Sequence, residues 1–165
     1  AVVARWAHNP KVAGSSPASA TNKGCITENV AHPKFFIAME FTPNHISDLA
    51  PNEIFVFGSN LAGRHGGGAA RAAYRYFGAI MGQGVGLQGQ SYAIPTMQGG
   101  VETIAPYVDE FIDFARQHPQ LKFLVTRIGC GIAGFKDEEI APLFRNALGI
   151  NNILLPREFV DILNQ

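Results

Sequence analysis

Charged residues are scarce in this chain of 165 residues, in which Asp, Glu, Lys and Arg together make up 16%. An average soluble domain carries roughly 25%. The 13 basic and 13 acidic residues cancel, but residues 1–38 carry a charge of +3 and residues 39–165 a charge of −3. Because the longer part is mildly acidic, we expect no strong binding to duplex nucleic acid, which requires a clustered basic face.

Long hydrophobic runs are also missing. The longest apolar run near the start of the chain, residues 35–39, is far shorter than the ~20 residues that a membrane-spanning helix needs. Ala18-Ser19-Ala20 is like the cleavage site of a secretory signal, but no apolar segment of about 7–15 residues precedes it. The sequence therefore predicts no membrane association and a cytoplasmic location.

Cysteine is rare too, since only Cys25 and Cys130 occur. Two cysteines cannot form a disulfide framework, and we expect both thiols to be reduced. Neither a CxxC pair nor an HExxH motif is found, so the sequence predicts no metal site and no bound cofactor.

The first 38 residues differ in composition from the remainder. Residues 1–34 are rich in Ala, Ser, Pro, Asn and Lys and follow neither a helical nor a strand period. Residues 7–21, AHNPKVAGSSPASAT, resemble a peptide that arises when a transfer-RNA gene is translated by mistake. Met39 precedes a polar lead-in and the first expected strand. We therefore expect a disordered or non-native arm over residues 1–38 and one domain over residues 39–165.

Strand-like and helix-like segments alternate after Met39. The expected strands are residues 53–57, 91–96, 122–128 and 152–155, and the expected helices are residues 69–77, 101–117, 137–148 and 159–163. Residues 53–57, EIFVF, are almost wholly apolar, which is typical of a strand buried on both faces of a parallel sheet. This order predicts an α/β fold with a mostly parallel central sheet.

Two glycine-rich loops follow two of these strands. They span residues 58–68 and 129–135, and 12 of the 18 glycines fall between positions 58 and 100. In open α/β sheets ligands bind beyond the carboxyl ends of strands, and glycine lets the backbone approach a ligand closely. The first loop also leads into a helix, whose N-terminal end favours an anion. We therefore expect a diphosphate between the loops, with residues 83–90 as either a lid or a mobile connection.

Four segments carry a family resemblance: FVFGSN (55–60), GGGAARA (66–72), SYAIPT (91–96) and VTRIGCGIAGF (125–135). Together they resemble the macro domain, an α/β/α module that binds ADP-ribose, over about residues 53–148. Asn60 and Gly66–Gly68 match the first motif of that family, and Gly131, Ile132, Gly134 and Phe135 match the second. The segments are also similar to small proteins of bacteria and their phages.

The resemblance implies a three-layer α/β/α domain that binds ADP-ribose, a related nucleotide diphosphate or an ADP-ribosylated macromolecule. Hydrolysis of an ADP-ribose linkage is a further implied activity, with Asn60 and His65 as catalytic candidates. The alternative is a structural or interaction protein of a phage or mobile element that binds no nucleotide. The expected ligand-binding residues are Gly58, Ser59, Asn60, Arg64, Gly66, Gly67, Gly68, Gly129, Cys130, Gly131, Ile132, Ala133, Gly134 and Phe135.

Several positions depart from the family pattern or have two interpretations. Ala69 and Ala70 stand where many macro-type hydrolases have an aspartate, and Ala133 replaces another. The resemblance therefore supports binding more than catalysis. Arg127 is either a phosphate contact or the partner of an acid, and Asp137 is either a helix cap or a catalytic group. Cys130 is either a buried structural residue or a nucleophile.

Overall fold

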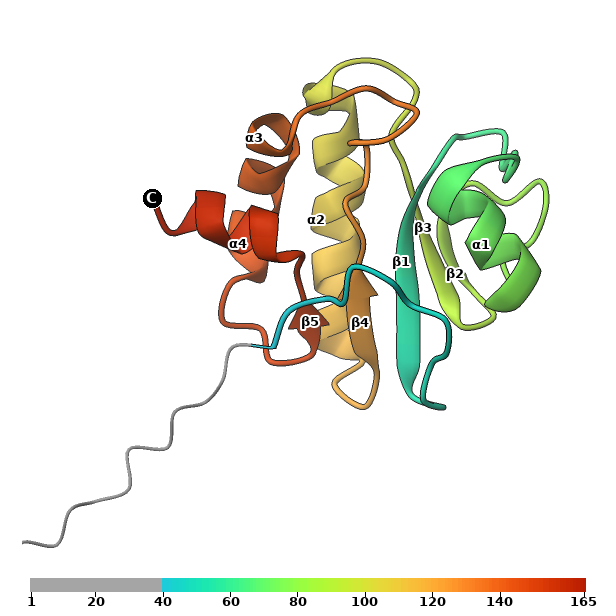
Figure 1. Cartoon of the computed structure of the whole chain (residues 1–165), viewed down its shortest axis with the longest axis horizontal. Coiled ribbons are helices and arrows are strands. Elements are labelled where there is room, and N and C mark those ends of the chain that lie inside the picture. Colours follow the sequence, from blue (N-terminus) through green and yellow to red (C-terminus); the bar gives the residue numbers. More distant parts are fainter. Residues whose placement is uncertain (1–39) are drawn as a thin grey trace, which may run out of the picture. The chain divides into compact units, whose positions relative to one another are not determined.

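A computed structural model describes residues 40–165, so the predicted arm over residues 1–38 lies outside the described residues. Five strands form one sheet in the order β2-β3-β1-β4-β5 (Figure 1). The strands are β1 (Glu53–Ser59), β2 (Gly86–Gln88), β3 (Ser91–Pro95), β4 (Lys122–Val125) and β5 (Ile153–Leu154). Only the β2–β3 pair is antiparallel, which confirms the prediction of a mostly parallel α/β sheet.

Helical segments connect the strands. They are α1 (Gly68–Tyr76), α2 (Val101–Gln117), α3 (Asp137–Ile140), a 3-10 segment η1 (Ala141–Ala147) and α4 (Arg157–Leu163). The bounds of α2 are those predicted from its apolar stripe, and Ile104, Val108 and Phe111 of that stripe are fully buried. No helix among the described residues is both long and apolar enough to cross a membrane.

Side chains of β1 alternate between two cores. Ile54 and Val56 belong to a large cluster with buried residues of α2, η1 and α4, whereas Phe55 and Phe57 belong to a smaller cluster with α1. Figure 1 shows α1 on one side of the sheet and α2 on the other. Because both faces are covered, β1 consists almost entirely of apolar residues, as predicted.

Three local features differ from the sequence predictions. Residues 86–88 form β2, whereas a loop was expected, because the three-residue strand is too short to show an alternating pattern. The helix predicted over residues 137–148 becomes 3-10 from Ala141 onward, where Pro142 lacks the N–H that an α-helix requires. The strand predicted over residues 122–128 ends at Val125 as β4, three residues earlier than expected.

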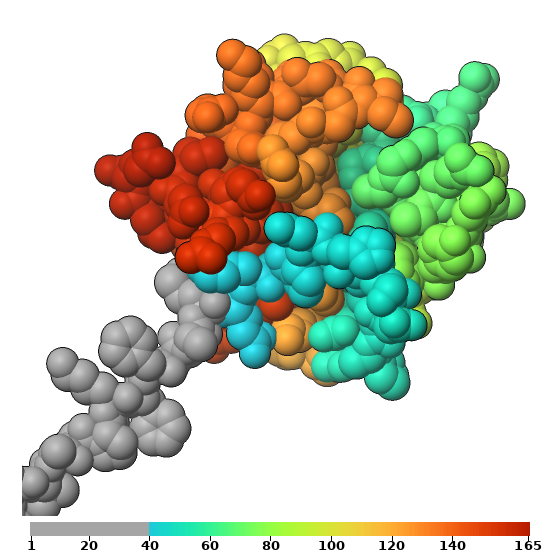
Figure 2. Space-filling view, viewed as in Figure 1, coloured from blue at the N-terminus to red at the C-terminus, as the bar shows by residue number. Residues whose placement is uncertain are grey.

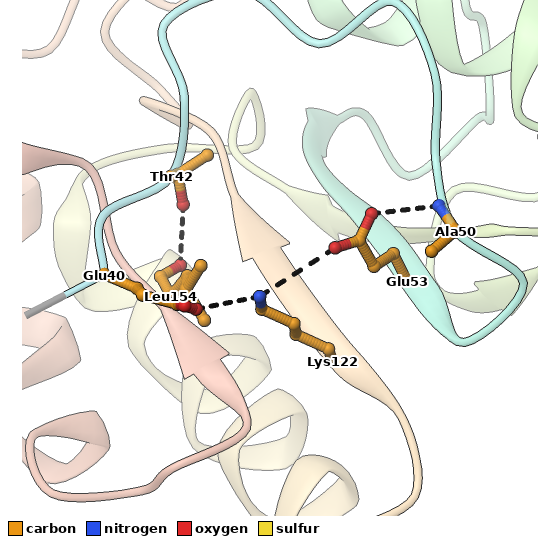
Figure 3. Close-up of polar contacts among 6 residues, drawn as sticks. All are labelled: Glu40, Thr42, Ala50, Glu53, Lys122 and Leu154. Atoms are coloured by element: carbon orange, nitrogen blue, oxygen red, sulfur yellow. Dashed lines mark hydrogen bonds and ion pairs between the residues drawn. The ribbon is translucent and has the colours of Figure 1, made fainter.

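Residues 40–50, called the leading segment below, pack across the sheet before β1 begins. Thr42 donates hydrogen bonds from its backbone N–H to Leu155 O (2.9 Å) and from its hydroxyl to Leu154 O (2.8 Å). Lys122 Nζ lies 2.8 Å from Glu40 Oε2 and 3.9 Å from Glu53 Oε1 (Figure 3). Ile46 and Leu49 of the same segment pack against the smaller core. The segment is thereby fixed at both of its ends.

Candidate functional site

The two glycine loops meet at the carboxyl edge of the sheet. Because β1, β3 and β4 are parallel, the residues that follow them lie along this same edge. A cavity between the loops, called the loop cavity below, has about 640 Å³ of empty space, its open mouth included.

Most of the predicted ligand-binding residues line the loop cavity. Those that line it are Gly58, Ser59, Asn60, Arg64, Gly67, Gly68, Gly129, Gly131, Ile132 and Ala133. Those that do not are Gly66, Cys130, Gly134 and Phe135, and the predicted catalytic residue His65 does not line it either. Gly66 and Gly134 are exposed on the loops, and Phe135 packs against the large core. The structure therefore brings the two predicted loops together but turns a third of their residues elsewhere.

Sequence reasoning omitted six residues that line the cavity: Ala69, Ala70, Thr96, Met97, Thr126 and Ile128. Thr96 and Met97 directly follow β3, the strand next to β1, so the strand-end rule that located the two loops also applies to them. Arg127, which had two interpretations, lines the cavity as well.

The N-terminal end of α1 presents free backbone donors to the cavity. Gly67 is the N-cap and carries no capping side chain, and the first turn holds no acidic residue. Among the described residues, no acceptor is bonded to the N–H groups of Gly68, Ala69 and Ala70. These three donors and the positive end of the helix dipole favour a bound anion.

The second loop presents a matching set of donors. Gly131 O accepts a hydrogen bond from Gly134 N (3.0 Å), and Gly129 O accepts one from Phe135 N (3.0 Å), which closes the loop on itself. The N–H groups of Gly131, Ile132 and Ala133 have no acceptor among the described residues. A methyl group added at Gly131 would meet no atom within 4 Å, so the space above this loop is open.

Ile132 reaches across the cavity toward the first loop. A Cβ built on Gly67 would lie 2.8 Å from Ile132 Cδ1, so the end of the Ile132 side chain lies close to the first loop. The side chain of Ile132 is nevertheless 71% exposed. It therefore forms an apolar wall of the cavity.

Asn60 closes the first loop through its carboxamide. Its Oδ1 accepts a hydrogen bond from Arg64 N (2.9 Å), and its Nδ2 donates one to Arg64 O (2.8 Å). One N–H of the amide and one lone pair of its oxygen stay available to a ligand. The guanidinium of Arg64 is exposed at the rim.

His65 is buried beneath the first loop and is only 1% exposed. Its Nε2 lies 3.0 Å from Ile80 O and 3.1 Å from Gln83 O, two acceptors, so this nitrogen carries the proton. The ring packs edge-on against Phe57 with the centroids 5.3 Å apart. His65 thus attaches residues 80–83 to the first loop and does not reach the cavity.

The segment that was expected to be a lid or a mobile connection packs tightly on the first loop. A Cβ on Gly63 would lie 2.3 Å from Gln83 N, and one on Gly84 would lie 2.1 Å from Asn60 O. The hydroxyl of Ser59 donates to Gly84 O. No residue between 78 and 90 lines the loop cavity. This segment therefore contacts the first loop away from the cavity and supports its conformation.

Arg127 pairs with Asp137, which is one of the two roles considered for Arg127. Neither role considered for Asp137 included this pair, and the N-cap of α3 is Lys136. Arg127 Nε lies 3.0 Å from Asp137 Oδ1, and its Nη2 contacts Oδ2, so the pair is bidentate. This hydrogen bonding lowers the pKa of Asp137 and raises that of Arg127. Burial, and next the Asp137 carboxylate, raise the pKa of the Cys130 thiol to about 12. Cys130 is therefore protonated at neutral pH, which disfavours a nucleophilic role.

Two further cavities adjoin the loop cavity. The His45 cavity lies between the leading segment and α1, and shares Gly68, Ala69, Thr126, Arg127 and Gly131 with the loop cavity. The Glu158 cavity lies between the leading segment and the start of α4. All three meet at Thr126 and Arg127. Figure 2 shows this side of the molecule, where the leading segment (cyan) lies beside the second loop (orange).

No group of three or more His, Cys, Asp or Glu side chains within residues 40–165 is arranged to hold a metal ion. Comparison of the chain with known protein families, with curated proteins and with solved structures finds no match.

Proposed function

We propose that residues 39–165 form a three-layer α/β/α domain of macro type that binds ADP-ribose or a related nucleotide diphosphate. The observation that carries this proposal is that two sets of donors line one cavity: three free N–H groups at the start of α1 and three on the second loop. A diphosphate placed between them would accept hydrogen bonds from both loops.

The charges near the cavity are consistent with an anionic ligand. Arg64 and Arg127 line it, whereas no Asp or Glu does. Because the folded part has a net charge of −3, long-range attraction does not contribute, and binding depends on these local dipoles and cations. The His45 cavity continues from the loop cavity, which gives space for a ligand longer than a single phosphate group.

The lining of the cavity favours a binding function over hydrolysis. None of its residues is His, Cys, Asp or Glu, the side chains that most often transfer protons in catalysis. Asn60 is the one predicted catalytic residue that reaches the cavity, and its amide cannot act as a base. We therefore propose a module that recognises ADP-ribose, free or attached to a macromolecule.

Calorimetric titration of the full chain with ADP-ribose tests the proposal. We expect saturable binding that is competed by ADP. No heat and no thermal shift at millimolar ADP-ribose would contradict the proposal and favour the structural or interaction role. Incubation with ADP-ribosylated protein separates a binding module from a hydrolase, since release of ADP-ribose would establish hydrolytic activity.

Gly131→Glu tests where the diphosphate lies. The new carboxylate extends into open space beside the free donors, so it blocks the site and repels the anion. We expect at least a tenfold loss of affinity, equivalent to about 1.4 kcal/mol. Gln120→Glu adds the same charge in an exposed turn before β4, at the end of that strand opposite to the cavity, so it is the matched control and should bind normally. Unchanged affinity in Gly131→Glu would refute this placement.

A further inference from the structure

Glu158 is a carboxylate without a partner at the wall of a cavity. It lies in the first turn of α4 and lines the Glu158 cavity together with Thr42, Pro43, Asn44, Val125, Thr126, Arg127 and Pro156. Its Oε2 has no solvent contact and accepts no hydrogen bond from any described residue. Leaving a buried carboxylate oxygen unpaired is unfavourable, so a donor brought by a ligand would be stabilised there.

The two hydroxyl groups of the same cavity can act only as acceptors. Thr42 Oγ1 donates its proton to Leu154 O at 2.8 Å, and Thr126 Oγ1 donates its proton to Val56 O at 2.8 Å. Each hydroxyl oxygen keeps its lone pairs but has no proton left to donate. With Glu158, they give the cavity three side chains whose oxygens accept hydrogen bonds.

The nearby cations are engaged elsewhere. The guanidinium of Arg157 lies over the ring of Phe41, 5.4 Å from its centroid. Arg127 is held by the bidentate contact with Asp137. No ion pair with Glu158 occurs among the described residues. Glu158 is one of the charges that raise the pKa of Arg127, so the two groups attract each other at longer range, but no described cation is hydrogen-bonded to the carboxylate.

We propose that the Glu158 cavity is a binding site for an N–H-bearing group, either an organic ammonium or guanidinium ion or the amino group of a nucleobase. The Glu158 carboxylate accepts the main hydrogen bond, and the hydroxyl oxygens of Thr42 and Thr126 accept others. The site stands apart from the donors proposed for the diphosphate, although Thr126 and Arg127 border both.

Titration of the full chain with three probes tests this site and its source of N–H groups. Agmatine supplies a guanidinium without a phosphate. Adenosine monophosphate supplies a nucleobase amino group, and inosine monophosphate carries a carbonyl oxygen in its place. Saturable agmatine binding identifies a cation site, whereas a preference for adenosine over inosine monophosphate identifies a nucleobase site. Either result supports the proposal when it depends on Glu158.

Glu158→Gln tests whether binding depends on the carboxylate, because this variant keeps the shape of the side chain and removes its charge. We expect it to weaken agmatine binding about tenfold or more, or to reduce the preference for adenosine over inosine monophosphate to a similar degree. Glu138→Gln is the matched control, since Glu138 is exposed on α3 and lines none of the three cavities.

A measurement on the unchanged chain makes the test independent of how the variant folds. The carboxyl carbon signal of Glu158 in NMR spectra should shift on addition of the probe that binds. If that signal does not move with any probe and Glu158→Gln changes no affinity, the proposal is wrong. Gly131→Glu separates this site from the proposed diphosphate site, because it should weaken ADP-ribose binding and leave agmatine binding unchanged.

Discussion

At the scale of single residues, environment decides chemistry more than residue type does. Cys130 stands between two glycines after a strand, a position where a nucleophile would be accessible. Its partial burial and the neighbouring Asp137 carboxylate instead disfavour the thiolate and raise its pKa to about 12. The thiol also lies 3.4 Å from Ile128 O, to which it donates. Cys130 is therefore a structural thiol at neutral pH.

Alkylation of Cys130 should consequently be slow. In a Cys25→Ser variant, we expect iodoacetamide at pH 8 to react with Cys130 about a hundredfold or more slowly than with glutathione, because the thiolate is the reactive form. The rate should keep rising above pH 9. A rate that levels off near pH 8 would contradict the raised pKa. The same variant in denaturant is the control, and it should react at the ordinary rate.

His65 shows what sequence alone leaves open at this scale. A histidine in a glycine-rich loop is a plausible acid or base, and nothing nearby in the sequence indicates that its ring is buried. Its partners, the carbonyls of Ile80 and Gln83, lie 15 and 18 residues away in a segment without a clear period. The placement of Asn60 and most of the loop glycines beside the cavity was easier to predict, because it depends on local turns and on the strand that precedes them.

At the scale of elements, residues 78–84 and the first loop form one packed unit. The close approaches at Gly63 and Gly84 leave no room for a methyl group, and His65 bonds across the same contact. The glycines of this segment suggested a lid or a mobile connection, but in the structure they allow the two backbones to pack closely. The position of the α1 N-terminus, and with it the proposed anion site, depends on this support.

Replacing His65 tests this dependence. His65→Ala removes a buried ring and the hydrogen bonds to Ile80 O and Gln83 O. We expect the free energy of unfolding to fall by roughly 2–3 kcal/mol. Amide exchange of residues 80–84 should accelerate. His45→Ala, at an exposed position, is the control and should change stability little. Normal stability and unchanged exchange in His65→Ala would contradict the supporting role.

The elements themselves were predictable to different degrees. The apolar strand β1 and the striped helix α2 follow from patterns that burial imposes on a sequence, and both were predicted. The short strand β2 and the 3-10 segment η1 were not, because β2 depends on pairing with β3 and η1 on the effect of one proline. The leading segment forms one wall of the His45 and Glu158 cavities. Its position depends on contacts with residues far away in the sequence, which no local pattern indicates.

At the scale of the whole molecule, a few polar contacts connect parts that are distant in sequence. The Arg127–Asp137 pair joins the end of β4 to the start of α3, on either side of the second loop. Arg127 is half exposed, whereas the Asp137 side chain is 17% exposed, so solvent weakens the pair without removing it. The pair thereby links the carboxyl edge of the sheet to α3.

Stability should report this pair through its pH dependence. Arg127 lowers the pKa of Asp137 below its ordinary value of 3.8, so the contribution is complete above pH 3.8 and is lost as the pH falls further. Asp137→Asn should be less stable than the unchanged chain by about 1 kcal/mol at neutral pH, a difference that shrinks below pH 3.8. Urea unfolding of both proteins at neutral pH and below pH 3.8 measures this difference in stability.

The exposed pair Asp113–Arg116 supplies the control for this experiment. Both side chains are more than half exposed, so Asp113→Asn should change stability little at any pH. A difference between Asp137→Asn and the unchanged chain that stays constant down to pH 2 would contradict the role of the charge.

The leading segment makes the His45 and Glu158 cavities sensitive to mechanical force. A pull applied at Glu40 would load the Glu40–Lys122 ion pair and the Thr42 hydrogen bonds to Leu154 and Leu155 before it reaches β1. Residues 43–46, which come next, form a wall of the His45 and Glu158 cavities. Tension at this end would therefore peel open the two cavities while the sheet stays intact, and a ligand bound there would resist the peeling force.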